Sequence, residues 1–356
     1  MWFASAIMAE PLGEVVPTNL AMVTPALAVV VVLAVVFDYV NGFHDTANAI
    51  ATSVATRALR PAHAILMATA FNFIGAFAGT AVAKTIGSGL VDDQTTTTAI
   101  IIAALIGAIA WDLITWRLGL PSSSSHALIG GLLGATIVGA GWSALKIGNL
   151  SSGIIGKVIV PLVSSPILGF VIAFVLMVAI MWIFRSGRRR PMQRRFRRLQ
   201  VFSAGYMAFA HGSNDAQKTM GVITLALFSA GVIPTNTVPW WVIVIAASAI
   251  STGTAVGGWR IMKTMGQKVT DLEPVQGFAA ETTGASIILG AAQLGMPVST
   301  TQVISSAIMG VGTSQGAKHV RWGVARDILI AWVLTIPAAG LIGAACWYGL
   351  KLIGVA

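Results

Sequence analysis

Charged side chains are scarce in this sequence: only 10% of its 356 residues are charged, against about 25% in soluble globular proteins. Hydrophobic residues make up 56% of the chain, and the mean hydropathy is +0.83. This composition excludes an ordinary soluble enzyme. Long apolar stretches interrupted by Gly and Pro are typical of an all-α polytopic membrane protein that lies in a lipid bilayer.

Cysteine is almost absent, and so are the common catalytic motifs. The single cysteine, Cys346, excludes an intramolecular disulfide framework and a cysteine-only metal cluster. No HExxH or P-loop pattern occurs, so we expect neither a hydrolase nor an ATP-driven pump. We therefore expect no enzyme activity, no cofactor and no resident metal. Residues 1–20 also lack a basic n-region, which predicts that the first apolar segment is retained.

The formal net charge of +10 comes mostly from one stretch of the chain. Residues 185–198 contain eight of the 22 basic residues. A run of arginines fits a contact with anionic lipid or RNA. Because apolar stretches flank the run on both sides, we interpret it as a cytoplasmic linker that orients the protein by the positive-inside rule, with no nucleic-acid partner.

Twelve apolar segments divide equally around the arginine run. They lie at roughly 21–40, 43–56, 62–83, 99–118, 122–142 and 158–184, and then at 199–212, 215–232, 238–259, 276–294, 298–314 and 325–350. The sequence thus predicts two membrane halves, residues 1–184 and 199–356, joined by the basic linker 185–198.

Two motifs recur in the same order in both halves. Residues 41–48, Asn-Gly-Phe-His-Asp-Thr-Ala-Asn, align with residues 211–218, His-Gly-Ser-Asn-Asp-Ala-Gln-Lys, at an offset of 170. Residues 119–126, Gly-Leu-Pro-Ser-Ser-Ser-Ser-His, align with residues 295–302, Gly-Met-Pro-Val-Ser-Thr-Thr-Gln, at an offset of 176. Two matches in register indicate an internal duplication.

Charge placement predicts opposite orientations for the two halves. The loop after the third segment carries one basic and two acidic residues in the first half, but three basic and two acidic residues in the second, so its net charge changes sign. Opposite charge in equivalent loops is the signature of an inverted-topology repeat. We expect broken helices, with the first two segments of each half forming one crossing, and about 10–12 membrane helices. The sequence leaves open whether the segments after Pro121 and Pro297 are re-entrant.

The same charges predict the orientation in the cytoplasmic membrane. With both termini outside and the basic linker inside, 17 of the 22 basic residues lie on the cytoplasmic side. The opposite orientation would reverse that ratio, which the positive-inside rule disfavours.

Acidic side chains inside apolar segments need a reason, since a charge at the bilayer centre costs about 2.5–3.5 kcal/mol or more. Asp45 and Asp215 occupy equivalent places, and each shares a helix face with the residue three positions later, Asn48 or Lys218. Carboxylate and amide oxygens suit Na⁺, protons or the hydroxyls of a protonated oxyanion. A glycine three residues before each acid permits close approach or unwinding of the backbone. A structural ion pair or helix cap is the alternative.

The second motif reads as a helix start. Pro favours the first helical position, and nearby Ser or Thr can cap the helix. A helix N-terminus binds anions, and half-helix N-termini bind anionic groups in transporters. We therefore predict that the substrate contacts Ser123, Ser124 and Ser125 in one half and Ser299, Thr300 and Thr301 in the other, together with the two acids. The alternative is that these hydroxyls only satisfy freed backbone groups.

Three further side chains are candidates. Glu281 lies in an apolar segment and is predicted to contribute to cation coupling with Asp45, Asn48, Asp215 and Lys218. His44 and His126 are candidates for proton relay, although a membrane histidine is about as often a packing or hydrogen-bonding residue.

The doubled motifs resemble those of the inorganic phosphate transporter (PiT) family, and most closely its bacterial low-affinity branch. The resemblance covers nearly the whole chain. It implies a symporter that takes up inorganic phosphate across the cytoplasmic membrane, coupled to Na⁺ or H⁺, in some members as a divalent metal–phosphate complex. It also implies that Asp45, Asn48, Ser123–Ser125, Asp215 and Ser299–Thr301 line the phosphate and cation sites.

Two positions depart from the family pattern. Lys218 stands where many members have Asn, and Gln302 stands where they have His. We interpret Lys218 as a tethered cation in the place of a Na⁺, which favours H⁺ over Na⁺ as the coupling ion; a structural ion pair with Asp215 is the alternative.

Phosphate is favoured over sulfate on chemical grounds as well, because only phosphate species carry a hydroxyl that can donate to a carboxylate at neutral pH. The rival functions are a symporter of another oxyanion, such as sulfate, a passive anion channel, and a structural or receptor-like membrane protein. The sequence also allows a homo-oligomer.

Overall fold

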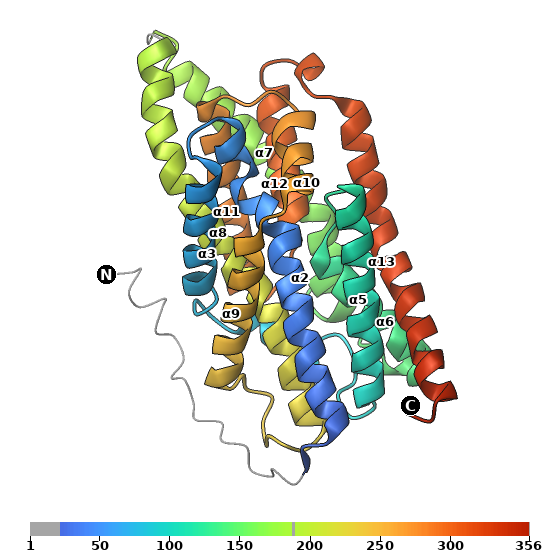
Figure 1. Cartoon of the computed structure of the whole chain (residues 1–356). Coiled ribbons are helices and arrows are strands. Elements are labelled where there is room, and N and C mark those ends of the chain that lie inside the picture. The colour runs from blue at the N-terminus through green and yellow to red at the C-terminus, as the bar shows by residue number, and fades with distance from the viewer. Residues whose placement is uncertain (1–21, 187–188, 356) are drawn as a thin grey trace.

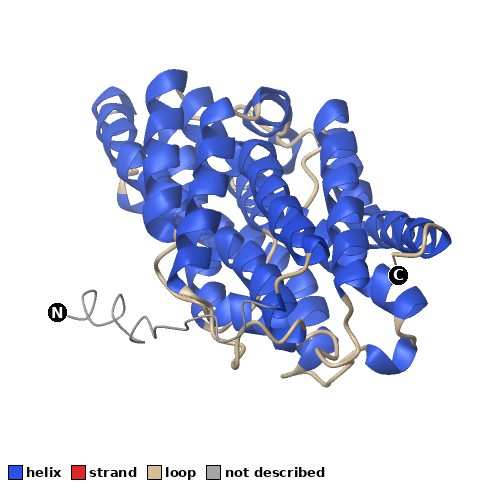
Figure 2. Ribbon diagram, turned by 60° about the horizontal axis from the view of Figure 1, so that its bottom comes forward, coloured by secondary structure: helices blue, strands red, loops and turns tan. Residues whose placement is uncertain are grey.

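The computed structural model describes residues 22–186 and 189–355; the predictions about residues 1–20 and the outer N-terminus lie outside the described residues. The described chain forms twelve α-helices and no strand (Figures 1 and 2). The prediction of an all-α protein is confirmed. The helices are α2 (Pro25–Ala55), α3 (Pro61–Gly75), α4 (Ala81–Ser88), α5 (Thr98–Leu118), α6 (Ser124–Gly139), α7 (Val160–Ile183), α8 (Arg189–Ser229), α9 (Trp240–Val256), α10 (Trp259–Lys263), α11 (Pro274–Gln293), α12 (Thr300–Thr313) and α13 (Trp322–Leu352).

Local signals explain several of these helix boundaries. The Thr24 hydroxyl caps α2 by accepting from the Leu27 N–H, and Pro25 occupies the first helical turn. Thr97 caps α5 in the same way. At its other end α5 ends at Gly119, whose φ of +67° is the left-handed conformation that glycine adopts without strain.

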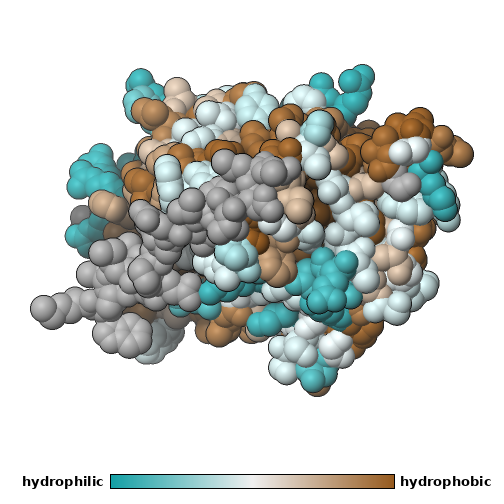
Figure 3. All heavy atoms as spheres, turned by 90° about the horizontal axis from the view of Figure 1, so that it is seen from below, coloured by the Kyte–Doolittle hydropathy of each residue, from teal (hydrophilic) through white to brown (hydrophobic). Residues whose placement is uncertain are grey.

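The outer surface of the bundle is apolar. Of the described helices, α2, α5, α13 and α7 with the turn before it are each long and apolar enough to cross a bilayer. A fifth candidate is formed by α9 together with α10 and the helical turn that follows α10. The chain bends by 60° between α9 and this second part. Figure 3 views the molecule from its lower end and shows apolar residues along much of the rim. Exposed apolar side chains of α7 and α13 include Val163, Ile167, Val171, Val175, Leu329, Ile330, Val333 and Leu341.

The order of elements repeats along the chain. Each half has a long helix (α2 or α8), a helix that breaks partway (α3–α4 or α9–α10), a hairpin of two helices (α5–α6 or α11–α12) and a further long helix (α7 or α13). Corresponding helices run in opposite directions: in Figure 1 α2 and α7 run upward, whereas α8 and α13 run downward. This arrangement is the one that an inverted-topology repeat requires.

The two halves are intertwined and do not form separate lobes. The first helix of each half packs against the broken helix of the other, as α2 on α9 and α8 on α3. The last helix of each half packs against the hairpin of the other, as α13 on α5 and α6, and α7 on α11 and α12. The described parts of the two predicted repeats, 1–184 and 199–356, therefore share one packed interior.

Two glycines permit the close contacts between the halves. A Cβ on Gly42 of α2 would lie 2.3 Å from the Ile250 carbonyl oxygen of α9. A Cβ on Gly212 of α8 would likewise lie 2.3 Å from the Asn72 carbonyl oxygen of α3. Of the two predicted roles of these glycines, close approach is confirmed and unwinding is wrong, because α2 and α8 continue as helices through them. The breaks lie instead between α3 and α4, between α9 and α10, and at the two hairpin tips.

Two further boundaries differ from the sequence prediction. α6 and α12 begin three residues after Pro121 and Pro297, at Ser124 and Thr300, so neither proline occupies the first helical position. Residues 189–198 of the basic linker are the first turns of α8, because Pro191 fits an N-terminal helical turn and the arginines between the apolar positions are good helix formers.

Candidate functional site

A polar layer separates two apolar cores in the middle of the bundle. On α2, the first core ends at Phe37 and the second begins at Ala47. On α8, the second core extends to Ala210 and the first resumes at Ala216. Both motif acids, Asp45 and Asp215, fall in the interval between the cores. Polar side chains at this depth are shielded from water and lipid, where electrostatic interactions are strong.

The tips of the two hairpins meet in this layer. The Ser125 hydroxyl of α6 donates to the Val298 carbonyl oxygen at 3.1 Å, and the Gln302 amide of α12 lies 3.5 Å from His126 Nδ1. Both helices start here with equivalent caps. Ser123 accepts from the His126 N–H and Ser299 accepts from the Gln302 N–H, each at 3.2 Å.

Each acidic motif is hydrogen-bonded to the hairpin of the other half. Thr301 donates to the Asp45 carboxylate at 3.3 Å. The Asn48 amide, one turn further along α2, donates to the Thr300 and Thr301 hydroxyls at 3.2 and 2.9 Å. Asp215 accepts from Thr300 at 3.3 Å. The first half thus supplies an acid and an amide to the helix start of the second half.

Lys218 is the only ammonium among the described residues of this layer. It is 1% exposed and forms an ion pair with Asp215 three residues earlier. It also donates to the Ser125 hydroxyl at the tip of the first hairpin. Because it links the acid of one half to the helix start of the other, Lys218 has a structural role whatever its role in transport.

A histidine accompanies each acid. His44 Nδ1 lies 2.7 Å from the Asp45 carboxylate, and its Nε2 lies 3.1 Å from the Thr115 hydroxyl. His211 Nε2 lies 3.3 Å from the Asp215 carboxylate, and its Nδ1 faces Asn72 at 3.1 Å. Ligand atoms of Asp45, His211 and Asp215 all lie within 4.8 Å of one another, so these three side chains are able to hold a cation between the halves.

Glu281 belongs to a separate cluster. Its carboxylate accepts hydrogen bonds from Thr52, Ser203 and Gln200. None of these residues contacts Asp45 or Asp215 through a hydrogen bond, although Thr52 lies one turn beyond Asn48 on α2. Thr52 lies on α2 with Asp45, and Gln200 and Ser203 lie on α8 with Asp215, so both helices connect this cluster to the motif acids.

The sequence-predicted residues separate into three groups. Seven meet across the interface of the halves: Asp45, Asn48, Ser125, Asp215, Lys218, Thr300 and Thr301. Ser123 and Ser299 cap their own helices. The Ser124 hydroxyl has no hydrogen-bond partner in the described chain and lies beside the Asp112 carboxylate, while Glu281 lies apart.

Sequence reasoning missed two buried carboxylates. Asp38 and Asp112 are both 0% exposed, and neither makes an ordinary side-chain hydrogen bond to any described residue. The signal that could have found both was the rarity of acids in apolar segments. Asp38 also lies seven residues before Asp45, which places the two acids on one side of a helix.

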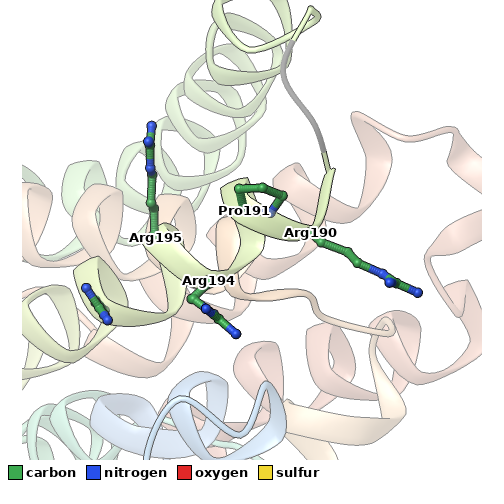
Figure 4. Close-up of a pocket in the computed structure, with 5 residues that line it drawn as sticks. Arg190, Pro191, Arg194 and Arg195 are labelled. Carbon is green, nitrogen blue, oxygen red and sulfur yellow. The ribbon is translucent and has the colours of Figure 1, made fainter.

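The basic run forms a different kind of surface. Arg190, Pro191, Arg194, Arg195 and Arg198 line a shallow pocket near the start of α8. Figure 4 shows that Arg195 points away from Arg190 and Arg194, so the guanidinium groups do not converge on one point. Side chains that diverge in this way are typical of a solvated helix end and do not form a single binding site.

The apolar exterior, the intertwined repeats and a buried polar layer at the centre define a helical membrane transport protein. The chain matches the model of the phosphate transporter family over residues 41–343. It is 48% identical over 327 residues to a protein of Bacillus subtilis named probable low-affinity inorganic phosphate transporter, covering 91% of this chain and 97% of that one. A Rhizobium meliloti protein of the same name is 47% identical over 331 residues, covering 92% and 98%.

A solved structure supports the same assignment. The structure of a protein named "The sodium-dependent phosphate transporter" superposes with a TM-score of 0.82 at 26% identity, covering 93% of this chain and 100% of that one. The chain belongs to the phosphate transporter family. The predicted resemblance is confirmed, and the relatives are transporters and not enzymes.

Proposed function

We propose that the protein is a symporter that takes up inorganic phosphate across the cytoplasmic membrane, driven by a cation gradient. The observation that carries this proposal is the meeting of two capped helix starts with two buried acids across the interface of the halves. Hydroxyls, helix N–H groups and the Lys218 ammonium bind anionic oxygens, and carboxylates accept from a protonated oxyanion or bind a cation. One layer therefore offers ligands for both cargo and coupling ion.

The substrate is expected to be phosphate and not sulfate. An anion that approaches Asp45 and Asp215 must reduce the repulsion between their carboxylates and its own oxygens. Phosphate does so by donating its hydroxyl to a carboxylate, and sulfate has no such proton at neutral pH. The names of the relatives agree with this choice.

The coupling ion is proposed to be H⁺, with Na⁺ as the alternative. Lys218 places a fixed positive charge against Asp215, where Asn48 occupies the equivalent position beside Asp45. A tethered ammonium competes with a mobile cation for the same carboxylate. The sodium dependence in the name of the structural relative supports the alternative. Glu281, whose carboxylate accepts hydrogen bonds from three side chains including Thr52, is proposed as an accessory coupling residue.

A divalent metal that travels with phosphate would fit between the motif acids. Asp45, His211 and Asp215 supply two carboxylates and an imidazole within 4.8 Å of one another. This ligand set suits a divalent cation such as Mg²⁺ or Zn²⁺. The metal would be cargo, carried as a metal–phosphate complex.

We further propose the topology. Residues 1–184 and 199–356 form inverted repeats, and the basic linker 185–198 faces the cytoplasm with the termini outside. Figure 1 shows the C-terminus at the end of the molecule opposite to the α7–α8 connection, as this orientation requires. A homo-oligomer is compatible with this orientation.

The test is radiolabelled phosphate uptake into proteoliposomes that contain the purified chain. A pH gradient and a Na⁺ gradient are imposed separately, with sulfate as competitor. We expect uptake under the pH gradient that excess sulfate does not inhibit. Equal inhibition by sulfate and phosphate would overturn the substrate proposal. Uptake that ignores both gradients would indicate a passive channel, and uptake that requires only the Na⁺ gradient would overturn proton coupling.

A further inference from the structure

One buried polar cluster forms no hydrogen bond with the motif acids Asp45 and Asp215. It consists of Asp38 and Asn41 on α2 and Thr219 on α8, two helices that pack against each other. All three side chains are 0% exposed. Asp38 and Asn41 are three residues apart and thus share a helix face. Asp38 lies about 10 Å from Asp45 along the helix axis, from seven residues at 1.5 Å each.

The polar atoms of this cluster have no ordinary hydrogen bonds. Within the described chain, neither Asp38 oxygen, neither polar atom of the Asn41 side chain, nor the Thr219 hydroxyl has a hydrogen-bond partner. Nevertheless the Asn41 and Thr219 side chains both lie beside the Asp38 carboxylate. Buried polar groups without partners are rare, because each loses its hydration without compensation.

The spacing fits a shared ion. Oxygen ligands of a cation contact the ion, at about 2.3–2.6 Å for Ca²⁺, and therefore stand further apart than two hydrogen-bonded groups. Asp38, Asn41 and Thr219 are neighbours whose polar atoms are not placed for an ordinary hydrogen bond to one another, as the ligands of such an ion would be. A carboxylate, an amide oxygen and a hydroxyl form a hard-oxygen set.

The charge balance favours a cation over a buried water molecule. Lys218 is the nearest fixed positive charge, but its ammonium is bound by Asp215 and Ser125. Of the motif acids, Asp45 has His44 and Asp215 has Lys218 and His211 as partners. Asp38 has no such partner among the described residues. A water molecule would satisfy hydrogen bonds, but only a cation would also compensate the ionised form of Asp38, whose burial as a bare charge is costly in a membrane protein.

We propose that Asp38, Asn41 and Thr219 bind a Na⁺ ion between α2 and α8, at a site distinct from the motif acids. The Asp38 carboxylate, Asn41 Oδ1 and Thr219 Oγ1 are its ligands. The ion balances Asp38 and so leaves Lys218 with Asp215. The site does not depend on which ion drives transport, and it exists whether or not the cargo is phosphate.

The test is binding of ²²Na⁺ to the purified full-length chain in detergent without phosphate. Asp38→Asn is expected to weaken Na⁺ binding at least about tenfold, since loss of even an outer-shell partner of a metal ligand costs 10–100-fold. Thr219→Val should weaken it by less, and Thr219→Ser should retain binding. Asp327→Asn makes the same chemical change as Asp38→Asn at an exposed site and should leave binding unchanged.

Two further variants separate this site from its surroundings. Asp45→Asn should retain the Na⁺ site, because its carboxylate is not a ligand. Full Na⁺ affinity in both Asp38→Asn and Thr219→Val, or no saturable binding to the wild-type chain, would overturn the proposal. Thr219→Val keeps the test valid if Asp38→Asn fails to fold. Phosphate binding is measured on the same samples, so that failure of the proposed function is seen separately from failure of the Na⁺ site.

Discussion

The two halves have the same acid and the same helix cap, but they surround the acid with different neighbours. Asp45 has a histidine directly before it and an amide one turn later, whereas Asp215 has a histidine one turn before it and an ammonium one turn later. The caps and the glycine contacts are nearly identical in geometry. The backbone packing around the two acids is thus nearly the same, while the charge around them differs.

This difference implies that the second half contains its own counter-ion and the first half does not. A tethered ammonium is always present, whereas a neutral amide leaves room for an exchangeable cation. The first half is therefore the more suitable place for the coupling ion, and the second for a permanent contact between the halves. The following variants test that comparison in order of decreasing expected effect.

The largest effect is expected for Asp215→Asn. It leaves the Lys218 ammonium buried without its carboxylate, and breaking a buried ion pair costs about 3–5 kcal/mol. Asp45→Asn should destabilise less, because His44 is able to be neutral. Thermal unfolding of the two purified variants measures the loss of stability, and phosphate uptake should be lost in both. The double variant Asp215→Asn with Lys218→Gln should recover stability without uptake; equal destabilisation by the two single variants would contradict the comparison.

The next effect is expected for Lys218→Asn, which gives the second motif the residue of the first. Removing the ammonium frees Asp215 for a mobile cation, so uptake under a Na⁺ gradient should rise relative to uptake under a pH gradient. Proteoliposome assays with each gradient measure the ratio. The control is Lys351→Asn, the same change near the C-terminus, which should leave the ratio unchanged. An unaltered ratio in Lys218→Asn would leave Lys218 with a structural role alone.

A smaller loss of stability, equal in the two halves, is expected when either Gly42 or Gly212 is replaced by alanine. Gly42→Ala and Gly212→Ala each place a Cβ 2.3 Å from a carbonyl oxygen of the other half, and overpacking costs about 1–3 kcal/mol. The control is Gly290→Ala, where nothing lies within 4 Å of the added Cβ and helix propensity improves. Melting temperatures should fall alike in the first two variants and not in the third. A fall in only one half would show that the two contacts are not equivalent.

The smallest effect is expected for the helix caps. Ser123→Ala and Ser299→Ala each remove one capping hydrogen bond, which is worth about 1 kcal/mol. Thermal unfolding should show similar losses in both variants, and Ser→Thr at either position should preserve stability because Thr also caps. If only one of the alanine variants loses stability, the two helix starts are not structurally equivalent.

The sequence predicted most of the secondary structure because apolar segments and helix-capping residues are local signals. The segment at 158–184 corresponds to α7, and that at 99–118 to α5. The breaks were harder to locate. Gly42 and Gly212 suggested unwinding, but a glycine that lets two helices touch leaves the same local pattern as one that ends a helix. Which role applies depends on the neighbouring helix, which the local sequence does not contain.

The candidate site shows the same division. Asp45 and Asp215 were identifiable because a charge in an apolar segment is costly and because the motif is repeated. Their partners were not, because Thr301 and Asp45 are 256 residues apart and belong to different halves. Asp38 and Asp112 lie outside the repeated motifs, so only their position in apolar segments marked them in the sequence, and the structure shows that both are completely buried.

By itself the sequence determined the class of protein, the two acids and the two helix starts, since composition, periodicity and capping are properties of short stretches of chain. Only the tertiary structure decided that α2 and α8 are unbroken, that the hairpin of one half meets the acid of the other, and that Asp38 lies against Thr219 with no counter-ion among the described residues. These features depend on contacts between segments more than a hundred residues apart. In a bilayer such contacts are selected by close backbone packing and by the need to pair buried polar groups.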